Sequence, residues 1–187
     1  MKKLLLSLLI ALSGCGGGQT YDYSITDPGP RITFPGLAGN YGSMEYQYLG
    51  EVDNPIPLAS GGVRHQFALI LEGINTCNLI YAVRVIDPDP RYVVVTKINP
   101  GKTKHSECGV QGYTLIQPEF IAPAPSLNPG DTGTFSAYLA PSGDMEVKVD
   151  GKIVWKGKMS AEGMQLKGLP GYRTDNIKID FNYSGNP

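Results

Sequence analysis

The sequence predicts an all-β protein, an antiparallel β-sandwich with little helix apart from an N-terminal export signal. Three observations lead to this prediction. About ten short segments rich in β-branched and aromatic residues follow one another after residue 30. Turn-forming residues separate them, and the 187-residue chain holds 24 glycines and 15 prolines. No heptad pattern and no internal repeat occurs. Short strands separated by turn signals within one domain are typical of sandwiches.

The N-terminal segment has the pattern of an export signal that ends in a cysteine. Lys2 and Lys3 precede the apolar run 4–12, which gives the charged and apolar regions of a signal peptide. The run is too short for a bilayer, which needs about 20 apolar residues. It ends in the letters LSGC, with Cys15 last. This box resembles the lipobox of bacterial lipoproteins.

That resemblance implies cleavage before Cys15 and a Cys15 thiol that carries acyl chains such as palmitate. Several acyl chains on one residue anchor a protein durably in a membrane. Gly16 stands where lipoproteins retained at the inner membrane carry aspartate, so we expect a lipid anchor in the cell outer membrane of a Gram-negative bacterium. The alternative is an ordinary cleaved signal with an incidental cysteine.

The expected organisation is a signal peptide (1–14), a lipidated Cys15 with a flexible tether (15–30), and one β-sandwich domain (31–187). The tether contains glycine, proline and polar residues without a period. Without residues 1–14, which contain two lysines and no acid, 14 basic side chains face 17 acidic ones and the net charge is about −3. That balance, and the lack of a Lys/Arg run, argue against a nucleic-acid partner.

Five segments predict strands before the last quarter of the chain. Residues 44–49 alternate between apolar and polar side chains, as half-exposed strands do. Residues 65–72 and 79–86 are apolar on both faces, which predicts strands in the middle of a layered structure. Residues 91–98 follow a proline-spaced turn, and 133–140 form another β-rich run.

A hairpin and a final strand are predicted in the last quarter. Residues 144–149 alternate and lead into Asp150-Gly151, a pair that a two-residue type I′ turn requires because both positions take positive φ. Residues 176–183 place apolar side chains on one face only. The one helical signal outside the N-terminus is a turn or two opened by Ser160 as N-cap.

Two cysteines remain after Cys15. In an exported protein an even remainder predicts a disulfide, here between Cys77 and Cys108. Closing this loop stabilises the fold by about 3 to 4 kcal/mol in the chain-entropy model. The zinc alternative needs a second ligand cluster, and only His105 lies near Cys108 in the sequence.

A set of motifs in the last forty residues points to a fold family. They are Val149-Asp150-Gly151, Val154-Trp155, Gly168 through Gly171, Arg173-Thr174-Asp175-Asn176 and Asp180-Phe181. In this order they resemble the last part of concanavalin A-like (laminin-G-like) jelly-roll domains, with Tyr172 at a position where an aliphatic residue is usual. The resemblance implies a jelly-roll sandwich. It leaves the function open, because this architecture hosts lectins, glycan-cleaving enzymes and adhesive modules.

The sequence contains no catalytic signature, and we expect a non-enzyme. Retaining glycosidases need two carboxyls about 5 Å apart, and the glutamates of this chain are isolated. No Gly-x-Ser-x-Gly elbow and no phosphate-binding loop occurs. A polysaccharide lyase remains an alternative, since Arg64 and His65 with Tyr81 or Arg84 offer a base and a cation.

The candidate residues for a ligand site or a structural cluster are Arg173, Asp175, Asn176, Trp155, Tyr46 and Tyr48. Tyrosine rings suit sugar C–H surfaces, although tyrosine and tryptophan on sandwich strands also pack inward. Arg173 precedes Asp175 by two residues, near enough for the two to pair. Thr174, Asp175 and Asn176 are interpreted as the entrance of the last strand, where short polar side chains suit turn geometry.

Calcium is the one cofactor considered. Asp175 and Asp180 supply oxygen ligands that suit this cation, and a structural calcium is a further alternative. Otherwise we expect no metal.

The leading hypothesis is a lipid-anchored, non-catalytic, lectin-like domain that binds glycan or another surface polymer. The first alternative is a protein-interaction lipoprotein of the envelope, either an assembly factor or a prophage surface-exclusion protein. The second is a polysaccharide lyase or hydrolase.

Overall fold

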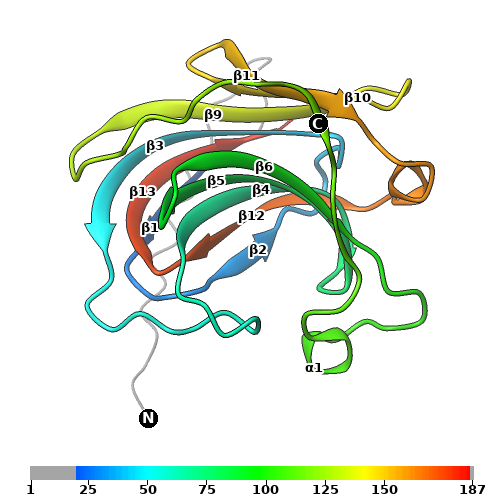
Figure 1. The fold of residues 1–187 in the computed structure, drawn as a ribbon, viewed down its shortest axis with the longest axis horizontal. Coiled ribbons are helices and arrows are strands. Elements are labelled where there is room, and N and C mark those ends of the chain that lie inside the picture. The colour runs from blue at the N-terminus through cyan, green and yellow to red at the C-terminus, as the bar shows by residue number, and fades with distance from the viewer. Residues whose placement is uncertain (1–19, 186–187) are drawn as a thin grey trace.

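Two curved antiparallel sheets stack face to face in the computed structural model, which describes residues 20–185 (Figure 1). The seven-stranded sheet has the order β1 (Thr20–Ile25), β13 (Ile177–Ser184), β3 (Tyr41–Glu51), β9 (Thr132–Leu139), β10 (Asp144–Val149), β11 (Lys152–Lys158), β8 (Pro118–Ile121). The six-stranded sheet has the order β2 (Arg31–Thr33), β12 (Leu169–Asp175), β4 (His65–Asn75), β5 (Asn78–Asp87), β6 (Arg91–Lys97), β7 (Tyr113–Leu115). The prediction of an antiparallel β-sandwich is confirmed.

The strands follow the hydrophobic pattern of the sequence. Strands β4 and β5 are buried on both faces over most of their length, as predicted for the middle of a layered structure. Strand β13 alternates strictly between buried and half-buried side chains. The β10–β11 hairpin turns at Asp150 and Gly151, with φ values of 49° and 75°, so the type I′ turn prediction is confirmed.

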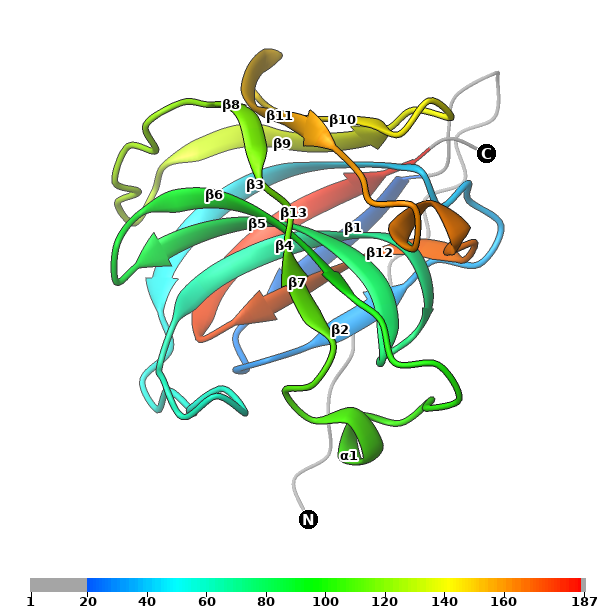
Figure 2. The same ribbon diagram turned by 45° about the vertical axis from the view of Figure 1, so that its right-hand side comes forward.

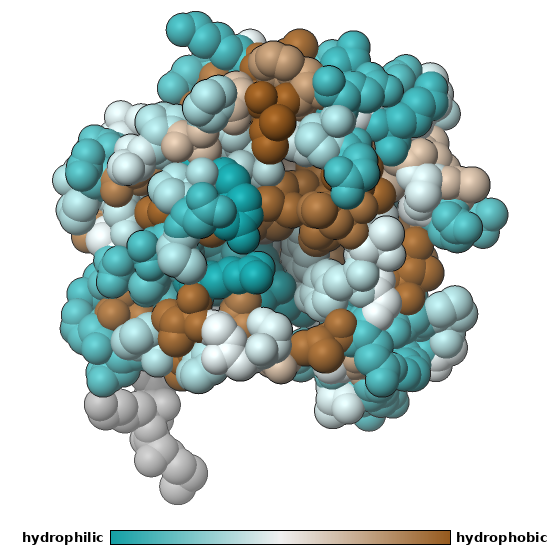
Figure 3. Space-filling view, in the orientation of Figure 1, coloured by the Kyte–Doolittle hydropathy of each residue, from teal (hydrophilic) through white to brown (hydrophobic). Residues whose placement is uncertain are grey.

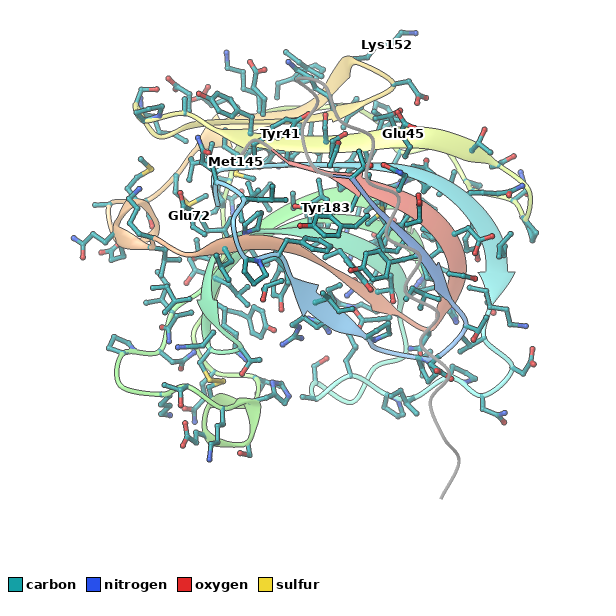
Figure 4. The ribbon with its side chains drawn as sticks, turned by 180° about the vertical axis from the view of Figure 1, so that it is seen from behind. Tyr41, Glu45, Glu72, Met145, Lys152 and Tyr183 are labelled. Atoms are coloured by element: carbon teal, nitrogen blue, oxygen red, sulfur yellow. A yellow bond between two sulfur atoms is a disulfide. The ribbon has the colours of Figure 1, made fainter. Side chains whose placement is uncertain are left out.

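The main core lies between the two sheets and is aromatic at one end. Phe34 packs against Tyr183, with ring centroids 4.3 Å apart, and Tyr172 meets Phe181 at 4.5 Å. Figure 4 shows Tyr183 in the space between the sheets. Aromatic pairs of this kind contribute about 0.5–1.5 kcal/mol each beyond their area burial.

The predicted tether through residue 30 is wrong for residues 20–25. These residues form β1, which pairs with β13 along its length. The prediction weighed the flanking glycines and prolines and overlooked the alternation of Tyr21, Tyr23 and Ile25, whose side chains pack against the core. The signal peptide and Cys15 lie outside the described residues.

Sequence reasoning also missed several short or irregular strands. Strand β12 includes Thr174 and Asp175, which were interpreted as the entrance of the last strand, and β2, β7 and β8 are three or four residues long. Thr174 and Asp175 therefore lie inside a strand, and Asn176 alone makes the turn from β12 to β13. Thr174 and Asp175 pair with Phe67 and Gln66 of β4. These partners lie more than 100 positions earlier in the chain, so no local sequence pattern indicates the pairing.

Two short helical pieces and a disulfide complete the described chain. The predicted helical turn is present as the 3-10 helix η1 (Gly163–Gln165), but its N-cap residue is Glu162 and not Ser160. The Ser160 hydroxyl still accepts a hydrogen bond from the Gly163 amide at 3.1 Å. The helix α1 (His105–Cys108) was not predicted. Its Cys108 forms the predicted disulfide with Cys77. Within residues 20–185, no helix has the length and apolar character needed to cross a membrane.

Candidate functional site

A large cavity lies on the concave face of the six-stranded sheet, the face turned away from the other sheet. Its volume is about 1080 Å³. The loop between β3 and β4 closes one side, and α1 with β7 and β8 closes the other (Figures 1 and 2). Figure 3 shows the hollow on this face, where hydrophobic and hydrophilic surfaces meet. We call it the concave-face cavity. Its volume is slightly above the usual range for small-molecule sites.

The floor of the concave-face cavity is apolar. Strand alternation sends every second side chain of β4, β5 and β6 to this face. They form a hydrophobic cluster separate from the main core: Ala68, Ile70, Leu79, Tyr81, Val83, Val85, Val93 and Val95. The walls keep this floor largely out of bulk water, which explains why β4 and β5 read as apolar on both faces.

The rim of the concave-face cavity is also apolar. Eleven large hydrophobic side chains are exposed in the described chain, and six of them line this cavity. These six are Ile56, Ile74, Val110, Tyr113, Leu115 and Ile121. Exposed apolar side chains gathered around a hollow mark a binding surface, whereas scattered ones do not.

Basic side chains outnumber acidic ones in the lining of the cavity. Four arginines line it, and the one acid among its described lining residues is Asp175. Arg173 is locked by that acid, because its Nε lies 2.7 Å from one carboxylate oxygen and its Nη2 lies 2.8 Å from the other. The Gln66 side chain donates to the same carboxylate at 2.8 Å. The predicted Arg173–Asp175 pair is therefore confirmed.

The Arg173–Asp175 pair is held on the buried part of the sheet. Burial alone lowers the pKa of Arg173, but the Asp175 carboxylate and its hydrogen bond outweigh that effect and leave the pKa above its ordinary value. The bidentate geometry also fixes the plane of the guanidinium. Arg173 is thus a permanently charged, pre-oriented group at the cavity wall.

Tyr81 is flanked by two cations at the centre of the cavity. The guanidinium carbons of Arg31 and Arg173 lie 5.6 Å and 5.4 Å from its ring centroid, within the range of cation–π interactions. Burial raises the pKa of Tyr81 to about 12, against the opposing effect of the two arginines. The tyrosine is therefore neutral at physiological pH and keeps its hydroxyl proton.

Lys97 ends the row of side chains that β6 sends to this face. It is fully buried, donates a hydrogen bond from Nζ to the Gly109 carbonyl at 2.8 Å, and lies 4.9 Å from the Tyr113 ring centroid. Desolvation, together with the nearby charges of Arg31 and Arg173, lowers the pKa of Lys97 to about 8. Lys97 does not itself line the cavity, but its ammonium group places a third cation close to the two arginines.

Asn176 connects the sheet to the loop that forms one wall. Its side-chain oxygen accepts from the Ile56 amide at 2.8 Å, and its amide nitrogen donates to the carbonyls of Ile56 and Arg64 at 2.9 and 3.0 Å. Its φ of 59° lies in the left-handed region, which asparagine tolerates better than most residues. One residue thus makes the turn and holds the wall of the cavity.

The structure separates the sequence candidates into two groups. Arg173, Asp175 and Asn176 line the concave-face cavity, and Trp155, although buried, contributes to its wall. Tyr46 and Tyr48 lie in the main core instead, where Tyr46 packs on Phe67 at 4.9 Å. The rings of these two tyrosines therefore do not face the cavity.

The residues considered for a lyase are not brought together. His65 pairs in register with Asp87, whereas Tyr81 pairs with Ile70, five residues along β4 and thus about 16 Å away. Arg84 projects from the opposite face of β5 and stacks on Tyr92 at 4.8 Å. His65, Tyr81 and Arg84 therefore do not form one group, and the cations beside Tyr81 are Arg31 and Arg173 instead.

The possible metal ligands are likewise divided. Asp175 is engaged by Arg173 and Gln66 in one sheet, whereas Asp180 projects from the outer face of the other. A different group, Glu51, His65 and Asp87, brings one ligand atom each within 4.8 Å of one another. His65 lies between the two carboxylates, with Nε2 3.6 Å from Glu51 and Nδ1 3.3 Å from Asp87.

Sequence reasoning missed Arg31, Gln66 and Lys97 as site residues. The one available signal was Lys97, which follows Val93 and Val95 in phase and so stands where an apolar side chain is expected. Arg31 and Gln66 carry no comparable signal, because β2 is too short for a pattern and Gln66 lies in an apolar run.

No protein-family model and no curated protein matches the chain. Among solved structures, it is similar to the CBM40 domain of the Ruminococcus gnavus IT-sialidase bound to α2,3 sialyllactose, with a TM-score of 0.51 at 6% identity over 91% of this chain and 92% of that one. The Caenorhabditis elegans galectin LEC-6 follows with a TM-score of 0.48 at 9% identity, covering 88% of this chain and 95% of that one. Toad ovary galectin in complex with thio-digalactose gives 0.48 at 13%, over 84% and 99%.

The fold and the site together define a class of protein. The chain is an antiparallel β-sandwich of the jelly-roll type with a ligand-sized cavity on one sheet face. At 6% identity, the similarity to the CBM40 domain concerns the fold.

Proposed function

We propose that this protein is a non-catalytic carbohydrate-binding domain and that the concave-face cavity is its site. The residues that line the cavity support this function best. The sheet floor is apolar, the ring of Tyr113 is exposed at the rim, and the hydrogen-bonding groups of Arg173, Asp175 and Gln66 lie next to the floor. Apolar rings for the C–H faces of a sugar, combined with a few oriented polar groups for its hydroxyls, are what such a ligand needs.

Two further observations favour this function. The sialidase CBM40 domain with a similar fold is bound to α2,3 sialyllactose. The residues that the sequence suggested for a lyase, His65, Tyr81 and Arg84, also lie apart. A binding module is therefore a better account of this chain than a lyase or hydrolase.

The proposed location is the outer membrane, with Cys15 as the lipid anchor. Its support is the charged start, the apolar run and the LSGC box of the sequence. Radiolabelled palmitate should enter the wild-type protein in a Gram-negative host and should not enter a Cys15→Ser variant. A Cys15→Ser variant labelled as strongly as the wild type would contradict the anchor.

The binding function is tested with the purified domain from residue 16 onward on a glycan array and in pull-downs with envelope polysaccharides. Val83→Trp fills the cavity floor and should abolish retention. Ile153→Trp is the matched control, because Ile153 is exposed on β11 and does not line the cavity. The proposal fails if neither assay retains the wild-type protein, or if both variants bind alike.

In-cell crosslinking to a single protein partner, without competition by sugars, would support the envelope-interaction alternative.

A further inference from the structure

The positive charge of the concave-face cavity is a local feature. The whole chain has 16 basic and 17 acidic side chains, which is nearly neutral. The described lining of the cavity has Arg31, Arg64, Arg91 and Arg173 against Asp175 alone. Asp89, outside the lining, pairs with Arg91, and Asp175 pairs with Arg173. Arg31 and Arg64 remain without an ion-pair partner in residues 20–185.

Arg31 is the arginine whose surroundings require a partner. Its Nε is buried and has no hydrogen-bond acceptor among the described residues. Leaving a buried donor unsatisfied is destabilising, and more so for a charged group. Its guanidinium stacks on the Tyr81 ring, which it shares with Arg173. An anion bound to this guanidinium would offset the repulsion between the two arginines.

Arg173 is already positioned to share such a ligand. Its contacts with Asp175 engage Nε and Nη2, so other N–H groups of its five remain free to donate. Because Asp175 is held in turn by Gln66, the guanidinium needs no rearrangement before binding. Fixed arginines of this kind are suited to a planar carboxylate.

Lys97 adds a third positive charge without a nearby acid. It is buried, and its ammonium group has one described hydrogen bond, to the Gly109 carbonyl. Arg31 and Arg173 are close enough to disfavour its protonated form. Three cations and one carboxylate leave two uncompensated charges beside Tyr81, and an anion is the partner that relieves their repulsion.

We propose that the ligand of the concave-face cavity is an acidic saccharide, whose carboxylate binds Arg31 and Arg173 beside Tyr81 while its less polar face packs on the valine floor. This inference rests on the proposed carbohydrate-binding function and names the class of sugar. The apolar floor and rim would contact the ring faces of the sugar and any apolar substituent. The arginines would bind its carboxylate.

The experiment compares acidic saccharides with their neutral counterparts. Calorimetric titration of the purified domain uses galacturonate oligosaccharides and sialyllactose, each beside the same molecule with its carboxyl reduced to an alcohol. We expect the acidic form to bind about tenfold or more tightly than the reduced form, and its affinity to fall as salt is raised. The reduced partner differs only at the group that the arginines are proposed to hold.

Variants assign the effect to Arg31. Arg31→Gln should remove the preference for the acidic form, and Arg31→Lys should restore part of it. Lys152→Gln is the matched control, since Lys152 is exposed at the β10–β11 hairpin, far from α1 and the cavity (Figure 4). Thermal unfolding of each variant confirms that the short strand β2 tolerates the change.

The possible results separate the two proposals. Equal binding of acidic and reduced forms overturns the acidic ligand and leaves carbohydrate binding intact. Binding of no saccharide in either form overturns both. Binding of the fatty acid decanoate, with no saccharide bound, overturns the sugar class as well. A preference for the acidic form that survives in Arg31→Gln overturns the role of Arg31.

Discussion

At the scale of single residues, the cavity is defined by charges that the fold has buried. Lys97 stands in phase with Val93 and Val95, where a sheet face is otherwise apolar. A buried ammonium with one carbonyl partner is costly because desolvation is only partly repaid. Residues that cost stability in the folded chain are candidates for function, and Lys97 lies beside the proposed carboxylate site.

The cost of Lys97 predicts a pH dependence with a defined sign. Its pKa is about 8 in the folded protein and 10.5 when exposed, so the folded state binds fewer protons between these values. The penalty is therefore fully present below pH 8 and disappears as the pH rises toward 10.5. Lys97→Met, compared with wild type, should gain most in melting temperature at pH 7 and progressively less up to pH 10, measured by circular dichroism.

Lys152→Met provides the control for that series. Lys152 is exposed at the β10–β11 turn, so the difference in melting temperature that it causes should stay constant across the same range. A Lys97→Met difference that does not change with pH would contradict the buried-charge interpretation.

At the scale of elements, one turn residue organises a wall of the site. The β3–β4 loop has no regular structure between residues 52 and 64, and Asn176 ties it to the β12–β13 turn at both Ile56 and Arg64. The two sheets of the sandwich meet at this turn, because β12 belongs to one and β13 to the other. The position of the cavity wall thus depends on the crossing between the sheets.

Two substitutions at Asn176 separate its backbone role from its side-chain role. Asn176→Gly keeps the positive φ and loses three hydrogen bonds, so we expect a loss of about 1–3 kcal/mol in the free energy of unfolding. Asn176→Ala should lose about 1 kcal/mol more, because alanine is strained at that φ. Urea unfolding measures both values.

Hydrogen exchange locates the effect of the Asn176 variants. The Ile56 amide, which donates to the Asn176 side chain, should exchange faster in both variants. Amides of the β10–β11 hairpin serve as the internal reference and should keep their protection. Unchanged exchange at Ile56 would show that the loop does not depend on Asn176.

At the scale of the whole molecule, tyrosines make the fold sensitive to alkali. Burial raises the pKa of seven of them above the ordinary value of 10: Tyr23, Tyr46, Tyr48, Tyr81, Tyr92, Tyr172 and Tyr183. A raised folded pKa gives stability that is complete below pH 10 and is lost as the pH rises above it. The protein should therefore unfold cooperatively in the alkaline range, with phenolate absorbance appearing together with the loss of circular dichroism.

Tyr183→Phe tests this interpretation at one position. The Tyr183 hydroxyl is buried without a hydrogen-bond partner among the described residues, so its removal should leave stability at pH 7 equal or higher. The variant should also lose less stability than wild type above pH 10. An alkaline transition identical to that of wild type would count against a role for buried tyrosines.

Prediction from sequence succeeded where a pattern extends over a whole strand. The alternation of β13, the doubly apolar runs of β4 and β5, and the Asp150-Gly151 turn all had local signals that the structure reproduces. It failed for β1, β2, β7, β8 and β12, which are short or flanked by glycine and proline. Such strands form because a partner strand completes their hydrogen bonds, and that partner is distant in sequence.

For the site, the sequence by itself determined the residue types and one local pair. Arg173 precedes Asp175 by two residues, which is near enough for the two to pair, and the unpredicted strand β12 sends both side chains to the same face. The disulfide also followed, because only Cys77 and Cys108 remained to pair. The jelly-roll resemblance of the last forty residues correctly predicted the class of fold.

Only the tertiary structure decided which residues share the cavity. Arg31 from β2, Arg173 from β12, Tyr81 from β5 and Lys97 from β6 come together because the strand order of the six-stranded sheet differs from the chain order. The stacking of the two sheets likewise places Tyr46 and Tyr48 in the main core. The alternation along a strand indicates which side chains share a face of the sheet. The pairing of distant strands decides which face packs in the core and which lines the cavity.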